Sequence, residues 1–446
     1  MKICTVRIFL GFLFFFLLFI EANAEDSWNL QGCIDYAVQN NPDLQAAEAK
    51  IKVSAYSLDF QKKLFFPRLD LNASTGYLDG EPTSSFAVIR GITEEEIRSS
   101  NVSGQYVSAA LALSVPVLKE GVLFAKNAPT INMATQQVSI DKNAYEARKN
   151  EIIFSISTSF FNLLKNNEDI KTAEEHMKSL KLDYEIAISK FKEELISKNE
   201  LLIAGVRLAS GEKELLTYRN LSQQLIADLA IKMGLDPIKP ITISEEDFTL
   251  PDLPSLDKLV NTALTNRPEI MAQETRVSMA KEDQRRAKNQ KYPNVDLIST
   301  YTLANDYGSR SNSLWASTLQ LNLPIFDFGA IKSQIESQKA KVSEEEKLRL
   351  SIKGNIVQEV ITTFTNINNA RSEIPLKEKM IEQSMENARL LRARFEQNLI
   401  SLSSVLEAEY TVYANQKALA QAKYDLRTGY LQLVKATGSG LILLSK

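Results

Sequence analysis

The sequence contains very few of the residues that usually form catalytic or metal centres. Among its 446 residues there are one histidine and two cysteines, and the methionines are scattered rather than arranged as a ladder for soft metals. No cysteine–histidine cluster, nucleophile elbow or phosphate-binding glycine loop occurs. The histidine, His176, stands among lysines and glutamates, which predicts an exposed helix face. We therefore expect no catalytic residue, no metal site, no cofactor and no enzymatic activity.

Long hydrophobic segments are absent except at the N-terminus. Lys2 and Arg7 precede an apolar run from Ile8 to Ile20, and a small-residue cleavage motif ends at Ala24. Because the run is too short for a membrane-spanning helix, residues 1–24 are predicted to be a secretory signal peptide. The formal net charge of −3 is mildly acidic, which argues against nucleic acid as a partner.

Removal of the signal peptide leaves one cysteine, Cys33, so no disulfide can form within the chain. The preceding Leu30-Gln-Gly permits two interpretations, a lipidation site or part of an amphipathic helix. Cys33 has helical spacing from Leu30, Ile34 and Ala37. Nine mostly polar residues separate the apolar run from this motif, which favours a buried helix cysteine over a lipid anchor.

The mature sequence consists of two related copies. Eight residues of the first copy recur 226 positions later, and the turn Phe191–Ser197 recurs as Phe395–Ser401, 204 positions later. The eight are Leu30, Ala37, Asn40, Pro42, Glu48, Pro67, Asp70 and Leu71. The predicted organisation is a first repeat at 25–236, an inter-repeat linker at 237–253, a second repeat at 254–438 and a C-terminal tail at 439–446.

Each copy follows the same predicted plan of helices. A first helix covers about 30–64 in the first copy. Neither glycine nor proline interrupts residues 130–193, which predicts one helix roughly 96 Å long at 1.5 Å per residue. The second long helix covers about 330–397, where Pro375 is expected to kink or break it. A returning helix in each copy then ends at a glycine.

Between the first helix and the long helix of each copy, apolar and polar residues alternate. The predicted strands are about 69–77, 107–115, 295–303 and 315–323. About nine residues is the length of a tilted membrane-spanning strand, but a soluble hairpin packed on a helix has the same pattern. The signal peptide and aromatic residues at strand ends favour the membrane, with a predicted interfacial girdle of Tyr77, Tyr106, Tyr301 and Trp315. Four strands cannot close a barrel, so membrane-spanning strands would require the chain to oligomerise.

Several short motifs occur in the order found in one known family. They are the helix breaks Asn40-Asn-Pro42 and Asn266-Arg-Pro268, the segments Pro116–Gly121 and Pro324–Gly329 that lead from a strand into a long helix, and Phe364–Asn369 and Val405–Ala408. Together with the duplication, they make the mature chain resemble the TolC-like outer membrane efflux protein family (outer membrane factors). The resemblance implies a mainly α fold with a small β part, built from a duplicated helix–strand–strand–long helix–return helix unit. It implies a trimeric 12-stranded outer-membrane β-barrel continued by a long α-helical periplasmic tunnel.

The same resemblance implies a function and partners. It implies a channel-tunnel in the outer membrane of a Gram-negative bacterium, extending into the periplasm and acting as the passive exit duct of a tripartite efflux or type I secretion system. The implied partners are a homotrimer, a periplasmic adaptor (membrane fusion) protein, an inner-membrane RND-type or ABC-type transporter and outer-membrane lipid. The alternative is a secreted or periplasmic coiled-coil scaffold or adhesin without transport, which explains the helices but not the four matched strands.

In this family the turn between the long and returning helices is the periplasmic tip that meets the adaptor. By resemblance, the tip residues here are Phe191, Glu194, Leu195, Ile196, Ser197, Phe395, Asn398, Leu399, Ile400 and Ser401. The family usually has glycine where Glu194 and Asn398 stand. Asparagine enters the left-handed region fairly readily and glutamate does not. We therefore expect the backbone of the first tip to differ from that of the second, or the helix to turn a residue or two away.

The family often places acidic residues after the tip, where they line the tunnel entrance. The corresponding residues are Glu200, Ser404 and Glu407. A ring of three Glu200 and three Glu407 side chains would favour cations, whereas the alternative is the solvated face of a coiled coil. Some relatives lock the second tip with a basic residue where Ile400 stands here. A lock in this chain must use other groups, such as Arg392, or Arg394 with Glu407.

Overall fold

The computed structural model describes residues 27–80, 102–125, 127–239, 241–244, 250–306 and 311–438. The predicted signal peptide and C-terminal tail lie outside the described residues. The chain divides into two compact units. We call them the helical unit, which comprises Met1–Gln45, Lys149–Ala263 and Gln358–Lys446, and the sheet unit, which comprises Ala46–Arg148 and Leu264–Val357.

The duplication seen in the sequence is present in the elements, whose lengths match between the copies. The matched helices are α2 (Leu30–Asn40) and α8 (Leu256–Asn266), α3 (Pro42–Lys63) and α9 (Pro268–Asn289), α6 (Pro129–Lys192) and α10 (Ala330–Glu396), and α7 (Lys198–Met233) and α11 (Leu402–Thr437). The first, second and fourth pairs have 11, 22 and 36 residues in both copies, and the long helices have 64 and 67. None of the helices in the described ranges is long and apolar enough to cross a membrane.

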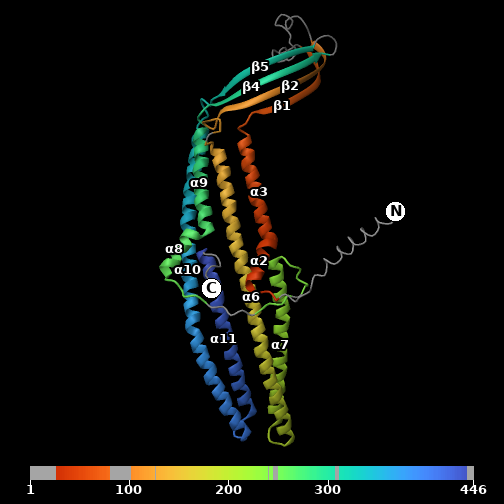
Figure 1. The fold of residues 1–446 in the computed structure, drawn as a ribbon, viewed down its shortest axis with the longest axis vertical. Coiled ribbons are helices and arrows are strands. Elements are labelled where there is room, and N and C mark those ends of the chain that lie inside the picture. The colour runs from red at the N-terminus through yellow and green to blue at the C-terminus, as the bar shows by residue number, and fades with distance from the viewer. Residues whose placement is uncertain are drawn as a thin grey trace, which may run out of the picture. The chain divides into compact units, whose positions relative to one another are not determined.

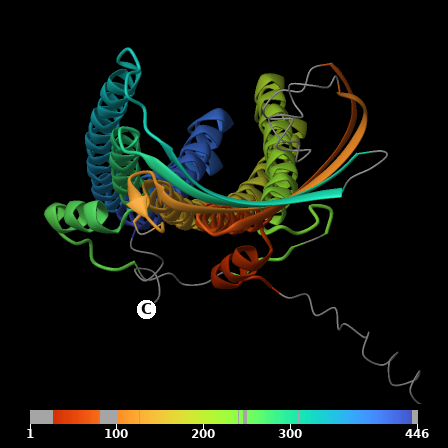
Figure 2. The same cartoon turned by 90° about the horizontal axis from the view of Figure 1, so that it is seen from above.

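Four antiparallel strands form the sheet in the order β1-β2-β4-β5 (Figure 1). They are β1 (Arg68–Gly80), β2 (Val102–Lys119), β4 (Asn294–Asp306) and β5 (Ser311–Asn322), and a short β3 (Val122–Leu123) pairs with the end of β2. The strands have 12 to 18 residues, so the prediction of about nine is too short. The backbone ladder continues beyond the alternating residues, because backbone pairing does not require an apolar side chain. Seen from above, the sheet is strongly curved (Figure 2).

One face of the sheet is apolar and exposed in this chain. The register aligns Leu71, Leu111, Tyr301 and Trp315 in one row across all four strands. The exposed apolar residues at odd-numbered positions are Leu69, Leu71, Tyr77, Val107, Leu111, Leu113, Leu297, Tyr301, Leu303, Trp315, Leu319 and Leu321. A contiguous apolar surface of this kind marks contact with a membrane or another protein, since soluble monomers rarely expose one.

The first predicted helix, 30–64, is in fact two helices separated at Asn41. The Asn41 Oδ1 atom accepts hydrogen bonds from the backbone N–H groups of Asp43 and Leu44 at 2.9 and 3.2 Å, and so caps α3. Its Nδ2 donates to the carbonyl of Lys232 in α7 at 2.7 Å. The apolar spacing continues across the break, which is why periodicity alone predicted a single helix.

Pro375, which was expected to kink or break the second long helix, does not end that helix. Pro375 lies inside α10, which continues to Glu396. A proline removes one backbone hydrogen bond, and long helical segments on both sides keep the remaining ladder intact. Of the two predicted effects, the break is therefore wrong and the kink stays a prediction, and α10 is the continuous counterpart of α6.

Cys33 is fully buried in the helical unit, in α2 beside Leu30, Ile34 and Ala37. This confirms the interpretation of Cys33 as a buried helix cysteine. Burial raises the pKa of its thiol to about 12, so the thiol is protonated and unreactive at neutral pH.

Candidate functional site

The two predicted tips lie in the helical unit and have the same backbone conformation. Glu194 has a φ of 60° and Asn398 a φ of 58°, both left-handed. At each tip, the residue after the left-handed one donates its backbone N–H to the carbonyl five positions earlier. Leu195 donates to Lys190 at 2.9 Å, and Leu399 donates to Arg394 at 3.0 Å. The expected difference between the tips is therefore wrong. These helix-ending hydrogen bonds offset the roughly 1–2 kcal/mol that a left-handed conformation costs glutamate.

The tips differ instead in how the returning helices begin. Ser197 and Glu200 form a reciprocal capping box at the start of α7. Ser401, the corresponding residue before α11, makes no side-chain bond to the helix backbone and instead pairs with the hydroxyl groups of Ser403 and Ser404. The reason is local, since Ser404 stands where Glu200 does and cannot complete a capping box.

Glu200 supplies the missing cap across the two copies. Its Oε2 accepts from the backbone N–H of Ser197 at 3.1 Å, while its Oε1 accepts from the backbone N–H of Leu402 at 3.3 Å. One carboxylate therefore caps α7 and also bonds to the first residue of α11. A negative charge at two helix N-termini is favourable because both carry partial positive charge.

A second contact between the copies involves Lys190, near the end of α6. Its Nζ donates to Asn398 Oδ1 at 2.6 Å and lies 4.7 Å from the centre of the Phe395 ring. Phe395 is only 4% exposed, whereas Phe191, at the same position in the first tip, is 37% exposed. Phe395 belongs to a core cluster with Leu180, Ala187, Ala204, Leu402, Val405 and Leu406. The second tip is thus anchored in the core, while the first presents its aromatic residue to solvent.

The predicted entrance acids have partners within the chain. Glu407 pairs with Arg207 of α7 at 2.9 Å, and both side chains are well exposed. The suggested Arg394–Glu407 pair is therefore wrong, because α7 brings Arg207 to Glu407. Whether Glu200, Ser404 and Glu407 line an entrance concerns a ring of several chains, so that role stays a prediction.

Arg392 lies in a partly buried charge cluster with Asp183 and Glu409 that sequence reasoning did not find. Its Nη2 donates to Asp183 Oδ1 at 2.7 Å and its Nε to Glu409 Oε1 at 2.9 Å. Burial, together with the hydrogen-bonded carboxyl of Glu409, raises the pKa of Asp183 to about 7. The available signal was an acid inside an apolar helical stripe, since Asp183 lies between Leu180 and Ala187.

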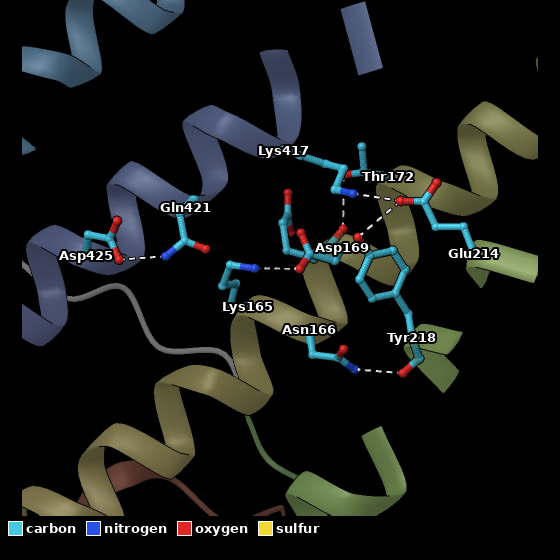
Figure 3. A network of polar contacts seen from close by, with 10 residues as sticks. Lys165, Asn166, Asp169, Thr172, Glu214, Tyr218, Lys417, Gln421 and Asp425 are labelled. Atoms are coloured by element: carbon cyan, nitrogen blue, oxygen red, sulfur yellow. Dashed lines mark hydrogen bonds and ion pairs between the residues drawn. The ribbon is translucent and has the colours of Figure 1, made fainter. Parts of the chain in front are cut away.

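A further polar network joins α6, α7 and α11 (Figure 3). Lys417 donates to Glu214 Oε1 at 2.7 Å, and Tyr218 donates to the same oxygen at 3.3 Å. Nearby, the His176 ring stacks on the Tyr413 ring at 4.3 Å between centroids, and burial lowers the pKa of His176. The predicted exposed position of His176 is wrong because another helix of the unit packs on that face.

The predicted girdle residues lie at two levels of the sheet. The backbones of Tyr77 and Tyr106 are at the end where β1 meets β2, and the side chain of Tyr106 lies outside the described part. Tyr301 is directly opposite Trp315 in the middle of the sheet, and Trp315 is 75% exposed. Tyr301 and Trp315 are therefore not at strand ends, because β4 and β5 extend beyond them to Asp306 and Ser311. The interfacial role of the four residues stays a prediction.

Comparison with known proteins agrees with this architecture. A family model described as "Outer membrane efflux protein" matches residues 33–234 and 259–439. The chain is 21% identical over 438 residues to the probable efflux pump outer membrane protein TtgC of Pseudomonas putida, covering 94% of this chain and 86% of that protein. It is 19% identical over 427 residues to outer membrane protein TolC of Escherichia coli, covering 92% and 82%.

A solved structure has the same fold. The chain superposes on the CmeC outer membrane channel of Campylobacter jejuni with a TM-score of 0.79 and 19% identity, covering 93% of this chain and 87% of that one. The likeness extends over both units, so each has a counterpart in a known channel.

Proposed function

The chain belongs to the outer membrane efflux protein family, and from this premise we propose that three identical chains assemble into one continuous exit duct. The chain is an outer-membrane efflux channel that extends into the periplasm, and its family consists of channels rather than enzymes. In the proposed trimer the duct is a passive conduit, so an inner-membrane pump supplies the energy for export.

The edges of the sheet carry this proposal. In the described residues β1 and β5 each pair with one neighbouring strand, so each has an open edge. Unpaired backbone groups cost several kcal/mol each in lipid, and four strands are too few to close a barrel. Pairing β1 of one chain with β5 of the next chain satisfies both edges, and three chains give a barrel of about twelve strands. The exposed apolar face around Leu71 and Trp315 then faces lipid.

Neighbouring chains of the trimer would also cover apolar stripes on the long helices. Leu202, Val206 and Leu216 are exposed on α7, at spacings that place them on one side of the helix. Leu376 and Met380 are exposed in the same way on α10. Helices of this length normally bury such stripes against other helices, and a ring of three chains provides the neighbouring helices.

The tips are the proposed contacts for a periplasmic adaptor, which links the duct to an inner-membrane RND-type or ABC-type transporter. Relatives include a toluene efflux pump protein and a pyoverdine export protein, so the cargo differs among them. Lys190 bonds to Asn398 and Glu200 bonds to Leu402, and we propose that these two contacts hold the tips in a closed state of the duct. We favour small molecules as the cargo of the duct, and proteins exported by type I secretion are the second proposed cargo.

The test begins with purification of the full-length protein from outer membranes. Extraction only by detergent, a trimeric mass and channels in planar bilayers are the expected results. An elongated protein that is soluble without detergent and forms no channels would refute the proposal and favour the coiled-coil scaffold. A strain lacking its own outer-membrane efflux channel adds a functional readout, because expression of the protein together with its adaptor and pump should restore export.

A further inference from the structure

The buried cluster near the tips contains two carboxyl groups and one cation. Arg392 of α10 bonds to Asp183 of α6 and to Glu409 of α11. The Asp183 side chain is 1% exposed and that of Glu409 is 14% exposed. Two buried carboxylates beside one guanidinium leave one uncompensated negative charge, which is costly unless a proton neutralises it.

Among the described residues, Arg392 is the cation that pairs with Asp183. Ser179 donates its hydroxyl to Glu409 Oε2 at 2.9 Å, while Asp183 Oδ2 accepts no hydrogen bond from any donor among the described atoms. The other charged and titratable groups on the neighbouring faces have partners of their own. Arg207 of α7 pairs with Glu407, and Lys417 of α11 pairs with Glu214 of α7. His176 of α6 stacks on Tyr413, and burial lowers its pKa although the nearby charge of Glu409 opposes this shift.

We propose that Asp183, Arg392 and Glu409 form a proton-operated latch, in which one proton on Asp183 holds α6, α10 and α11 together beside the tips. In the protonated state the Asp183 carboxyl donates to Glu409, and the guanidinium balances the remaining charge. When the proton leaves to solvent, two carboxylates repel across one cation and the three helices separate more easily. The consequence for flow through the duct rests on the proposed function.

The position of the cluster makes it suited to control the tips. Asp183 is nine residues before the end of α6, or roughly 14 Å along the helix axis. Arg392 is in the last turns of α10, and Glu409 is within the first turns of α11. Lys190, which bonds to Asn398, lies in α6, and Leu402, which bonds to Glu200 of α7, is the first residue of α11. A loosened latch therefore weakens the closed arrangement.

The direction of the pH effect follows from Asp183. Its pKa in the closed state is raised to about 7 from an ordinary 3.8, so the closed state binds the proton more tightly than an opened, solvated one. The resulting stabilisation of the closed state is complete at low pH and is lost as the pH rises through about 7. Between pH 6 and pH 8 the opening equilibrium should shift by about tenfold towards open.

Planar-bilayer recordings test the latch with one variant and one matched control. Asp183→Asn replaces the titrating group by a neutral amide, so its open probability should no longer change between pH 6 and pH 8. Asp169→Asn is the control, because Asp169 is a buried α6 carboxylate paired one-to-one with Lys165 at 2.7 Å. The wild type and Asp169→Asn should both show the roughly tenfold rise. A wild-type pH response that persists in Asp183→Asn would overturn the proposal.

Thermal unfolding in detergent provides a readout that does not depend on transport. Relative to Asp183→Asn, the wild type should lose thermal stability as the pH rises from 6 to 8. A difference in melting temperature that is independent of pH refutes the latch. If the wild type forms no channel at any pH but shows the expected melting difference, the proposed function fails while the proton-linked cluster stands.

Discussion

Replacing Glu200 by alanine tests whether one carboxylate controls two helix starts. The substitution removes the acceptor for the backbone N–H of Ser197 and for that of Leu402, at 3.1 and 3.3 Å. Ser197 still caps α7 through its hydroxyl, but each of the two lost hydrogen bonds to the charged acceptor costs about 1 kcal/mol at a partly exposed site, about 2 kcal/mol together. Because about 1.4 kcal/mol corresponds to a factor of ten, local opening of the two helix starts should increase by about 30-fold.

Hydrogen exchange followed by mass spectrometry measures this opening peptide by peptide. In Glu200→Ala, amides in the first turns of both α7 and α11 should exchange faster, while the core around Phe160 should be unchanged. Faster exchange confined to α7 would contradict the idea that Glu200 acts on both copies. Conductance should rise in the same variant, since one of the two contacts that hold the tips together is gone.

A second substitution separates the two roles of Glu200. Ser404→Glu places a carboxylate three residues after Ser401, where it can complete a capping box for α11. In the background of Glu200→Ala it should restore protection of the first turn of α11. It should not restore low conductance, because the contact between residue 200 and Leu402 remains absent. If both readouts return together, the effect on the tips comes from helix capping alone.

Three further substitutions probe packing, the membrane and the entrance. Gly211→Val should destabilise the protein by roughly 1–3 kcal/mol and lower its melting temperature, because even a Cβ at this position lies 2.7 Å from the buried side chain of Leu180. Leu71→Arg on the apolar face should cost about 2–4 kcal/mol at the middle of a bilayer and reduce recovery of trimer from membranes, whereas Asn72→Arg on the other face should not. Glu407→Gln should lower the cation preference in bilayers, and an unchanged preference would exclude Glu407 from the entrance.

Gly354 provides the control for the packing prediction. A Cβ added at this helical glycine meets no atom within 4 Å. Gly354→Ala should therefore raise stability by up to about 1 kcal/mol through helix propensity. Equal destabilisation by both glycine substitutions would show that backbone freedom, rather than the approach to Leu180, controls the effect.

The sequence by itself determined the duplicated plan of this protein. Matching residues at fixed offsets predicted two copies, and periods of two and of three to four residues predicted strands and helices in the right order. These signals are local, because each depends on neighbours within one or two turns of the same segment. For the same reason periodicity missed the break at Asn41, which only the motif Asn40-Asn-Pro42 indicated, and the strands were predicted too short.

Only the tertiary structure decided what the charged residues near the tips do. Glu200 was predicted from resemblance as an entrance residue, and the fold uses its carboxylate to join two helix starts 202 positions apart. Arg392 was one of two candidates for a lock, and the fold places its partly exposed guanidinium between the carboxyl groups of Asp183 and Glu409. Such contacts depend on which helix faces meet. Side chains about 200 residues apart in sequence give no periodic signal of their proximity, so the partners of a charge become known only when the helices are packed.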